Sequence, residues 1–343
     1  VRTGLPGGAE EAAGGDAAVA FAFGSSEPLV EVLGEGASTA EFLDRWKVPG
    51  ELASRVWEER FGEAAYVPLA QAALTEALKQ AGVTADDVNL LVVAGLHARA
   101  ARSVVAASGV AKTAVVDDLS GTVGNPGTAQ PGLLLASALD RAEPGQVIVV
   151  AQLADGADVT VYRATEALAR WRSSASRATV ADQVAGGRTG LPYATFLTWR
   201  GVLRREPPRR PDPEAPAAPP ARRSEAWKFG FTASRCEACG TRHLPPARVC
   251  LTCHTADRMA DERLADVDGT IATYTVDRLA FSLSPPVVVA VVDFDGGGRI
   301  QCEMTDVDPA EVAIGGRVRM TFRRLYTANN GVHDYFWKAK LTK

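Results

Sequence analysis

Cysteine is scarce in this sequence: its 343 residues include five, and none precedes Cys236. So few cysteines are typical of a reducing compartment, so we expect a cytoplasmic protein. No apolar run reaches the eighteen residues of a membrane helix, and the start lacks a basic-then-apolar signal segment. Neither sign of charge dominates, since the net charge is −4 and the pI is near 5.7. That balance disfavours nucleic acids and membrane surfaces as partners.

Four of the five cysteines form two pairs of the same spacing. Cys236-Glu-Ala-Cys239 is followed ten residues later by Cys250-Leu-Thr-Cys253. Each pair bends into a tight knuckle, and two knuckles can arrange four thiolates around one tetrahedral Zn²⁺. Four free or disulfide-linked thiols are the alternative. His243 and His254 stand beside the knuckles, but four sulfurs already complete the coordination shell. We therefore predict a structural rather than a catalytic zinc.

The first half of the chain alternates strand and helix patterns, as layered α/β proteins do. Apolar runs predict strands buried on both faces over 16–23, 88–94 and 146–153. Amphipathic patterns predict helices over 63–81, 100–108 and 131–139, with Pro68 near the start of the first and Gly82 at its end. Shorter strands are expected over 114–116 and 159–162. The alternation predicts an α/β unit over 1–172 that contains parallel strand pairs.

The composition changes after this unit. Residues 172–190 are rich in Ser, Ala, Gly and Arg without a period and predict a mobile linker, within a connecting region over 173–227. Within it, aromatic and aliphatic residues at helical spacing predict a helix over 193–203. The proline-rich stretch 207–220 predicts an extended, polyproline-like chain.

From residue 261 to the end the pattern is all-β. Strands are expected over 269–276, 287–293, 299–304, 317–323 and 334–339, with Gly296-Gly-Gly298 as a hairpin turn. About five strands in so short a segment predict a small Greek-key barrel of OB type over 261–343, preceded by the zinc ribbon over 228–260. The segment lacks a dominant basic, aromatic-studded face, which disfavours the nucleic-acid binding that some OB barrels perform.

Two resemblances follow from these motifs. The succession of helix, apolar strand, His97, a Gly124-Asn125 turn, helix, apolar strand and Gly-containing loop resembles the C-terminal half of the thiolase superfamily. Type III ketoacyl synthases and hydroxymethylglutaryl-CoA synthases are the most similar members. The Gly15-Asp16-Ala17 segment is similar to their Gly-Asp-Gly-Ala motif. The helix over 193–203, the two knuckles with His243-Leu-Pro-Pro246 between them and the barrel together resemble the DUF35 family over residues 190–343. Proteins of that family are acyl-CoA-associated and join a rubredoxin-like zinc ribbon to an OB-fold.

The thiolase resemblance implies a coenzyme A thioester as substrate and an acyl transfer that forms or cleaves a carbon–carbon bond. It places His97 and Asn125 at catalytic positions and Gly124, Gly127 and Gly156 at substrate-binding positions. An imidazole can lower the pKa of a thiol or donate to the thioester oxygen, and an amide can orient a water without titrating. The alternatives are that His97 is a buried, satisfied histidine and that Asn125 is an ordinary turn residue.

The family's nucleophilic cysteine has no counterpart here, because it belongs to the half of the fold that would precede Val1. A missing N-terminal half or a partner chain supplies it, or the unit is non-catalytic. A lone half exposes apolar faces, so we expect a thiolase-type partner and an oligomer.

Two hypotheses stay open: part of an acyl-CoA condensing or cleaving enzyme, an acyltransferase, and a non-catalytic assembly subunit that stabilises a thiolase. In either case the arginines at 200–223 meet CoA phosphates or form a solvated, partner-facing segment.

Overall fold

The computed structural model describes residues 4–174, 178–206 and 214–342. The chain divides into two compact units, residues 1–187 and 188–343. Each unit has its own hydrophobic core and is described separately below. No helix in the described parts of the chain combines the length and apolarity needed to cross a bilayer.

The first unit is built on a four-stranded sheet of order β1-β6-β5-β4. Its strands are β1 (Val30–Thr39), β4 (Val88–Gly95), β5 (Val147–Leu153) and β6 (Gly156–Ala164). The pair β4–β5 is parallel, with Leu91 opposite Val149, whereas β5–β6 and β1–β6 are antiparallel. The predicted strands over 88–94, 146–153 and 159–162 are therefore confirmed, and one of the three strand pairs is parallel.

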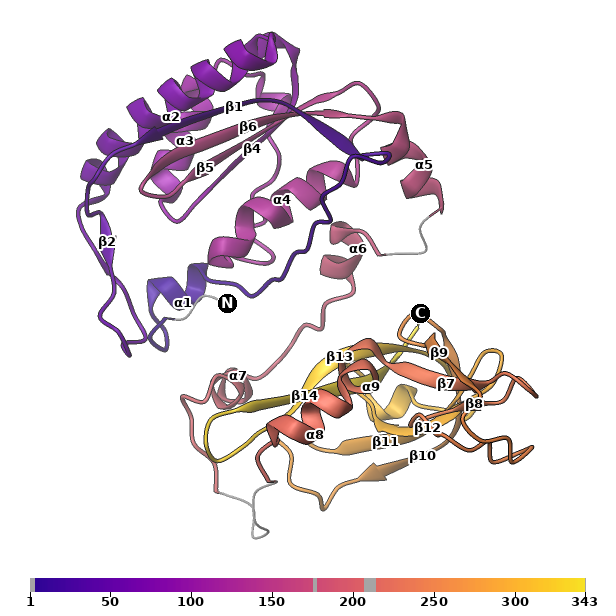
Figure 1. Cartoon of the computed structure of the whole chain (residues 1–343). Coiled ribbons are helices and arrows are strands. Elements are labelled where there is room, and N and C mark those ends of the chain that lie inside the picture. The colour runs from indigo at the N-terminus through magenta and orange to yellow at the C-terminus, as the bar shows by residue number, and fades with distance from the viewer. Residues whose placement is uncertain (1–3, 175–177, 207–213, 343) are drawn as a thin grey trace. The chain divides into compact units, whose positions relative to one another are not determined.

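Helices cover both faces of this sheet, as Figure 1 shows. Successive side chains of β4 point to opposite faces, so Leu91 and Val93 pack with α2 (Glu59–Ala81) and α3 (Ala98–Ala107). Leu90 and Val92 pack on the other face with α4 (Gln130–Leu139) and α5 (Glu166–Ser174). This double burial explains why the strand is apolar without alternation. The predicted layered α/β architecture is confirmed.

The helix predicted over 63–81 begins earlier, at Glu59, so Pro68 lies in its interior and not near its start. Its end is as predicted, because Gly82 takes the left-handed conformation and its N–H bonds to Leu78 and Lys79. The short strand predicted over 114–116 is a 3₁₀ turn, Lys112–Ala114, followed by one bridge between Val115 and Leu91. The remaining short elements of the unit are α1 (Ala9–Ala13), β2 (Arg45–Trp46), β3 (Arg55–Val56), Ala85–Asp87 and Gly127–Ala129.

The strand predicted over 16–23 is wrong. This segment is extended but has no ladder partner among the described residues, and Phe23 is 97% exposed. The place at the edge of the sheet beside β6 belongs to β1, whose glycines made it a poor strand candidate. Gly34 and Gly36 are buried because α2 lies directly on the backbone of β1, where a side chain would collide with Ala73 and Ala77.

The predicted linker over 172–190 contains a folded element. Helix α6 (Val180–Ala185) begins with a capping box at Thr179, and the Val180 N–H donates to Asp140 at 2.7 Å. Because Val180 is buried against the first unit, that unit extends beyond the predicted boundary at residue 172. Residues 175–177 and 207–213, which the linker and polyproline predictions include, lie outside the described residues.

The second unit opens with three short helices. The helix predicted over 193–203 is α7 (Tyr193–Trp199), which stops earlier because Gly201 adopts a left-handed conformation. Part of the proline-rich segment is helical, in α8 (Ala218–Arg223), and α9 (Glu225–Gly230) follows it. Both proline residues of α8 fit because the first turn of a helix needs no N–H from them.

Two sheets complete the second unit. The smaller has the order β8-β7-β9, with β7 (Thr232–Cys236), β8 (Arg242–His243) and β9 (Met259–Arg263). The larger has the order β12-β11-β10-β13-β14. Its strands are β10 (Gly269–Asp277), β11 (Val287–Phe294), β12 (Arg299–Glu303), β13 (Arg317–Thr327) and β14 (His333–Leu341), with a 3₁₀ turn at Pro309–Glu311.

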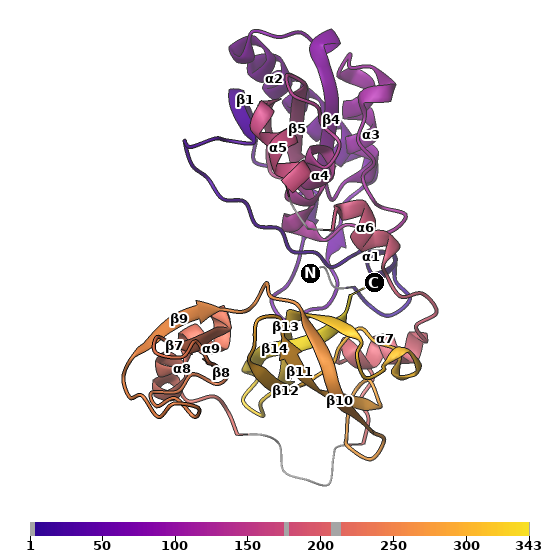
Figure 2. The same ribbon diagram turned by 90° about the vertical axis from the view of Figure 1, so that its right-hand side faces the viewer.

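The larger sheet closes on itself. A bridge joins Met304, just after β12, to Ala339 on β14, and the Thr305 N–H donates to the Ala339 carbonyl at 2.9 Å. Figure 2 shows the resulting barrel. Its core is aromatic: Phe231 is fully buried and contacts Phe294 and Trp337. The predicted all-β barrel of OB type is confirmed.

Candidate functional site

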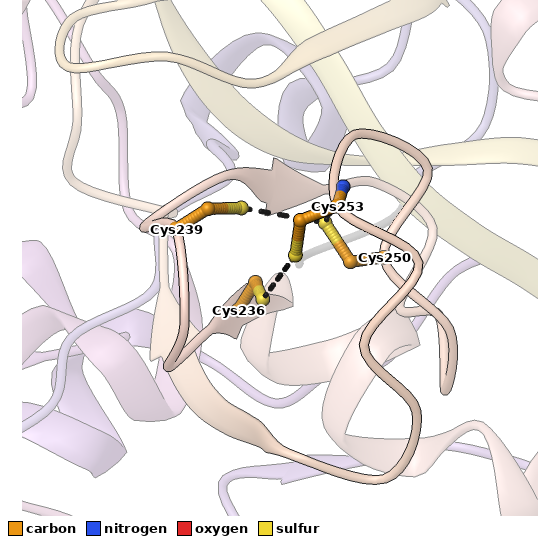
Figure 3. Close-up of side chains that lie close together, drawn as sticks. All are labelled: Cys236, Cys239, Cys250 and Cys253. Carbon is orange, nitrogen blue, oxygen red and sulfur yellow. Dashed lines mark hydrogen bonds between the residues drawn. The ribbon is translucent and has the colours of Figure 1, made fainter.

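The four knuckle cysteines converge on one point at the end of β7. Their sulfur atoms all lie within 4.8 Å of one another, with Cys236 Sγ 3.6 Å from Cys253 Sγ and Cys239 Sγ 3.5 Å from Cys250 Sγ (Figure 3). Cys236 and Cys250 are buried, and Cys239 and Cys253 are exposed. Four thiol donors in a compact cluster are the ligand set of a structural zinc, and these residues fit that ion.

The two knuckles repeat the same backbone geometry. In the first, the Cys236 N–H donates to Thr241 and the Gly240 N–H donates to the Cys236 carbonyl at 2.8 Å. In the second, the Cys250 N–H donates to Thr255 and the His254 N–H donates to the Cys250 carbonyl at 2.9 Å. The shared pattern is Cys-x-x-Cys-x-Thr, a repeat that the sequence contains and that the sequence analysis missed.

The second knuckle also favours the thiolate form of its sulfurs, the form that binds a metal. The N–H groups of Cys253 and Thr252 point at Cys250 Sγ at 3.5 and 3.4 Å, and these donors outweigh burial and lower the pKa of that thiol to about 5. The Thr255 hydroxyl lies 3.3 Å from Cys253 Sγ and lowers the pKa of that thiol as well. Donors that favour the thiolate favour the form that binds a cation.

One difference between the knuckles predicts a stabilising substitution. Gly240 and His254 occupy equivalent positions with φ near 75° and 60°, a left-handed conformation that suits glycine better than histidine. We expect His254→Gly to raise the free energy of unfolding of the zinc-loaded chain by about 0.5–1 kcal/mol, because relief of the strain exceeds the added chain entropy. The converse change, Gly240→Ala, should lower it. Chemical denaturation of both variants measures their free energies of unfolding. A lower value for His254→Gly than for the unmodified chain would contradict the prediction.

Arg242 joins the zinc ribbon to the barrel, a role that the sequence analysis did not predict. Its guanidinium holds Glu262 in a bidentate pair at 2.9 and 2.6 Å and donates to the Asp295 carbonyl at 2.7 Å. The same guanidinium holds the pKa of the Glu262 carboxyl below its usual value. A bidentate arginine pair fixes geometry as well as charge, so the ribbon is oriented on the hairpin after β11.

In the first unit, His97 follows β4 and caps α3. Its Nδ1 accepts the Ala100 N–H at 3.0 Å, so in the neutral ring the proton lies on Nε2. Nε2 is buried and has no hydrogen-bond partner among the described residues. It lies against Gly62 of α2, where a Cβ would approach it to 2.5 Å. Tyr66, one turn further along α2, lies beside the ring with centroids 6.1 Å apart.

Tyr66 and Asp44 add polar groups that the sequence analysis missed. The Tyr66 hydroxyl donates to Asp44 at 3.4 Å. Burial, followed by the charge of Asp44, raises the pKa of Tyr66 to about 12, so the phenol stays protonated at physiological pH. Gly62 and Tyr66 are one helical turn apart, so the sequence alone could have predicted that both lie on the same face of the helix, the face that packs against His97.

The side-chain amide of Asn125 makes its hydrogen bonds within the turn and to the end of β4. Its Nδ2 donates to the Gly95 carbonyl and to Gln130 Oε1, both at 2.8 Å, and its Oδ1 accepts the Gly127 N–H at 2.8 Å. These contacts tie the turn to the end of β4, and no hydrogen bond joins Asn125 to His97 among the described residues. The contacts favour the turn interpretation of Asn125, and a catalytic role for its amide stays a prediction.

The three predicted substrate-binding glycines lie in different surroundings. Gly127 lines a cavity of about 470 Å³ together with Leu96, Pro126 and Val19. Gly124 packs on the Gly14 carbonyl, where a Cβ would approach to 2.3 Å. Gly156 begins β6 with a φ of 134° and a similarly close Ser38 carbonyl. The structure thus gives Gly124 and Gly156 packing roles, and it places only Gly127 of the three on the cavity.

Comparison with known proteins identifies the second unit. Family models match twice: the ChsH2 rubredoxin-like zinc ribbon domain over residues 230–257 and the ChsH2 C-terminal OB-fold domain over residues 262–323. Both matches lie within the predicted ribbon and barrel. They assign the cysteine cluster to a zinc ribbon, in agreement with its geometry.

Curated relatives and a solved structure were also found. A DUF35 domain-containing scaffold protein of Methanocaldococcus jannaschii is 32% identical over 110 residues, which are 31% of this chain and 77% of the relative. One of Methanothermobacter thermautotrophicus is 29% identical over 117 residues, 33% of this chain and 87% of the relative. The structure of 3-oxoacyl-[acyl-carrier-protein] synthase III from Aquifex aeolicus is 17% identical with a TM-score of 0.36, over 40% of this chain and 46% of the synthase. The identity with the first relative, over most of its length, places the chain in the DUF35 family.

Proposed function

We propose that this chain is a scaffold subunit that binds and stabilises a thiolase-type protein acting on acyl-CoA. The observation that carries the proposal is membership in the DUF35 family, whose two curated relatives are both named scaffold proteins. The zinc in this proposal is a structural element of the ribbon, because four sulfurs leave no position for a substrate or a reactive water.

The side chains of the first unit support a non-catalytic role. Both N–H groups of Asn125 are used within the fold, and His97 turns Nε2 toward the backbone of α2. An amide whose N–H groups are both used within the fold has no donor left for a substrate.

Exposed apolar side chains of the first unit support a partner. Phe23 is 97% exposed at the end of the extended segment 16–23, and Leu43 and Trp57 are 62% and 59% exposed beside β2 and β3. Large apolar side chains that are exposed on a folded unit are candidates for a protein interface. We assign the extended segment to the interface with the thiolase-type partner.

Acyl transfer is the second candidate, and His97 is the observation that favours it. A neutral imidazole with its proton on Nε2 is a hydrogen-bond donor, the type of group that stabilises the oxygen of a thioester under attack. The attacking thiolate would come from a cysteine outside this sequence. Its sulfur would bond to the acyl carbon, and the coenzyme A thiolate would leave with the electron pair of the broken bond.

Co-expression tests the scaffold proposal. We expect the chain to elute with a thiolase-type protein of the same genome as one complex and to raise the unfolding temperature of that protein. Phe23→Asp should weaken the complex at least about tenfold, because it places a charge in an apolar interface. Size-exclusion chromatography with native mass spectrometry measures both. Leu279→Asp is the matched control, since Leu279 is also 97% exposed but lies in the second unit.

The outcomes separate the candidates. If neither substitution affects binding and the chain does not change the unfolding temperature of the thiolase, the scaffold proposal fails. If Leu279→Asp alone prevents binding, the interface lies on the second unit and the assignment of segment 16–23 is wrong. Loss of acyl transfer in a His97→Ala complex that still assembles would instead support the catalytic candidate.

A further inference from the structure

His243 is the most deeply buried histidine of the second unit. It ends the two-residue strand β8, opposite Ser234 of β7, and its side chain is 5% exposed. Its neighbour Arg242 is fully used by Glu262 and the barrel, whereas Nε2 of His243 is buried without a hydrogen-bond partner among the described residues. A buried N–H left unpaired costs about 1–3 kcal/mol, so such a group is expected to have an acceptor in the working protein.

A hydrogen-bonding interaction with the His243 ring is among the causes that lower the pKa of the Cys250 thiol, so the cysteine cluster lies within reach of this ring. The ring is not one of the ligands: the group that converges within 4.8 Å consists of the four cysteines. The exposed sulfurs have hydroxyl neighbours, Thr241 at 3.2 Å from Cys239 and Thr255 at 3.3 Å from Cys253. Cys250 is fully buried, and no hydroxyl contact to its sulfur is found among the described residues; the His243 ring interacts with that thiol instead.

We propose that His243 is a positioning residue for the zinc ribbon, whose Nε2–H donates to the Cys250 thiolate when zinc is bound. A sulfur in the thiolate form is an acceptor with several lone pairs, so a buried N–H beside it is satisfied without displacing a ligand. Groups that hydrogen-bond to ligands fix ligand orientation, and their loss commonly reduces metal affinity 10- to 100-fold. This role is independent of whether the chain is a scaffold or an enzyme.

Two substitutions distinguish the donor from the bulk of the ring. His243→Phe keeps a buried ring without the N–H, and His243→Gln keeps a donor without the ring. We expect the phenylalanine variant to bind zinc about 10- to 100-fold more weakly than the unmodified chain, and the glutamine variant to bind within a few-fold of it. Competition with a chromophoric chelator, on the purified full-length chain, measures both affinities. His333→Asn, at an exposed histidine of β14 outside the ribbon, is the matched control and should leave the affinity unchanged.

A spectroscopic readout covers the case in which a variant fails to fold. In the unmodified chain loaded with cadmium-113, the Nε2–H of His243 should show scalar coupling to the metal through the Cys250 sulfur. Absence of that coupling in the folded, cadmium-loaded chain would overturn the proposal. Equal zinc affinity in His243→Phe and the unmodified chain would also overturn it, as would equal weakening in both His243 variants, which would indicate packing alone.

Discussion

Cys250→Ser is expected to abolish tight zinc binding and to unfold the ribbon around it. The unfolded ribbon contains no preformed site, so the free energy of metal binding is also folding free energy for this segment. Cys250 is fully buried and receives two backbone N–H groups, and serine offers a poor zinc ligand in that position. We expect zinc affinity to fall at least about a thousandfold. Native mass spectrometry gives the zinc content, and chelator competition gives the affinity.

Cys302 provides the matched control, because it is the fifth cysteine and lies outside the cluster. It is buried in β12, where desolvation raises the pKa of its thiol to about 11 and keeps the sulfur neutral. Cys302→Ala should leave one zinc bound and cost about 1–2 kcal/mol of stability through the small cavity it creates. A Cys250→Ser chain that retains zinc as tightly as Cys302→Ala would contradict a four-thiolate site.

The zinc cluster was predictable from sequence because its determinants are local. Two pairs at the same spacing dictate two knuckles, and each knuckle brings its own backbone donors. The contribution of Arg242 was not predictable in this way. Its partners Glu262 and Asp295 lie 20 and 53 residues further along the chain, and nothing in the local pattern links them.

The strands at the centre of the first sheet were also predictable, because burial on both faces leaves an uninterrupted apolar run. The edge of the sheet was not. Segment 16–23 has the better strand composition, yet β1 with its glycines pairs with β6 along nine residue pairs. Tertiary packing determines which segment pairs with β6. The glycines of β1 allow α2 to pack directly on the strand backbone, and strand propensity calculated from local sequence does not include that contact.

The His97 region shows that the sequence also predicts the chemistry of a site only in part. The sequence identified a histidine at the end of a strand and an asparagine in a glycine turn, and both residues lie near the end of β4. What it could not give is the direction of each polar atom. Nδ1 of His97 faces the N-terminus of α3 and Nε2 faces Gly62, because α2 and α3 pack together there. Residue type predicts which chemistry is available, and packing decides which atom is free.

Gly36→Val is expected to separate α2 from the sheet and unfold the first unit. A Cβ at this position would lie 2.1 Å from the Ala73 carbonyl and 2.8 Å from the Ala77 nitrogen, and both atoms belong to helix backbone that cannot turn away. Valine adds two further methyl groups to that collision. Overpacking of this severity costs about 3 kcal/mol or more. Urea denaturation followed by circular dichroism measures the loss.

Ala37→Val separates this clash from any general effect of valine in β1. Ala37 is the next residue of the same strand, pairs with Asp158 and is exposed. Valine there suits an exposed strand position, so the free energy of unfolding should change by less than about 0.5 kcal/mol. If Gly36→Val were as stable as Ala37→Val, α2 could not rest on the backbone of β1. The glycines of that strand would then need an explanation other than close packing of helix and sheet.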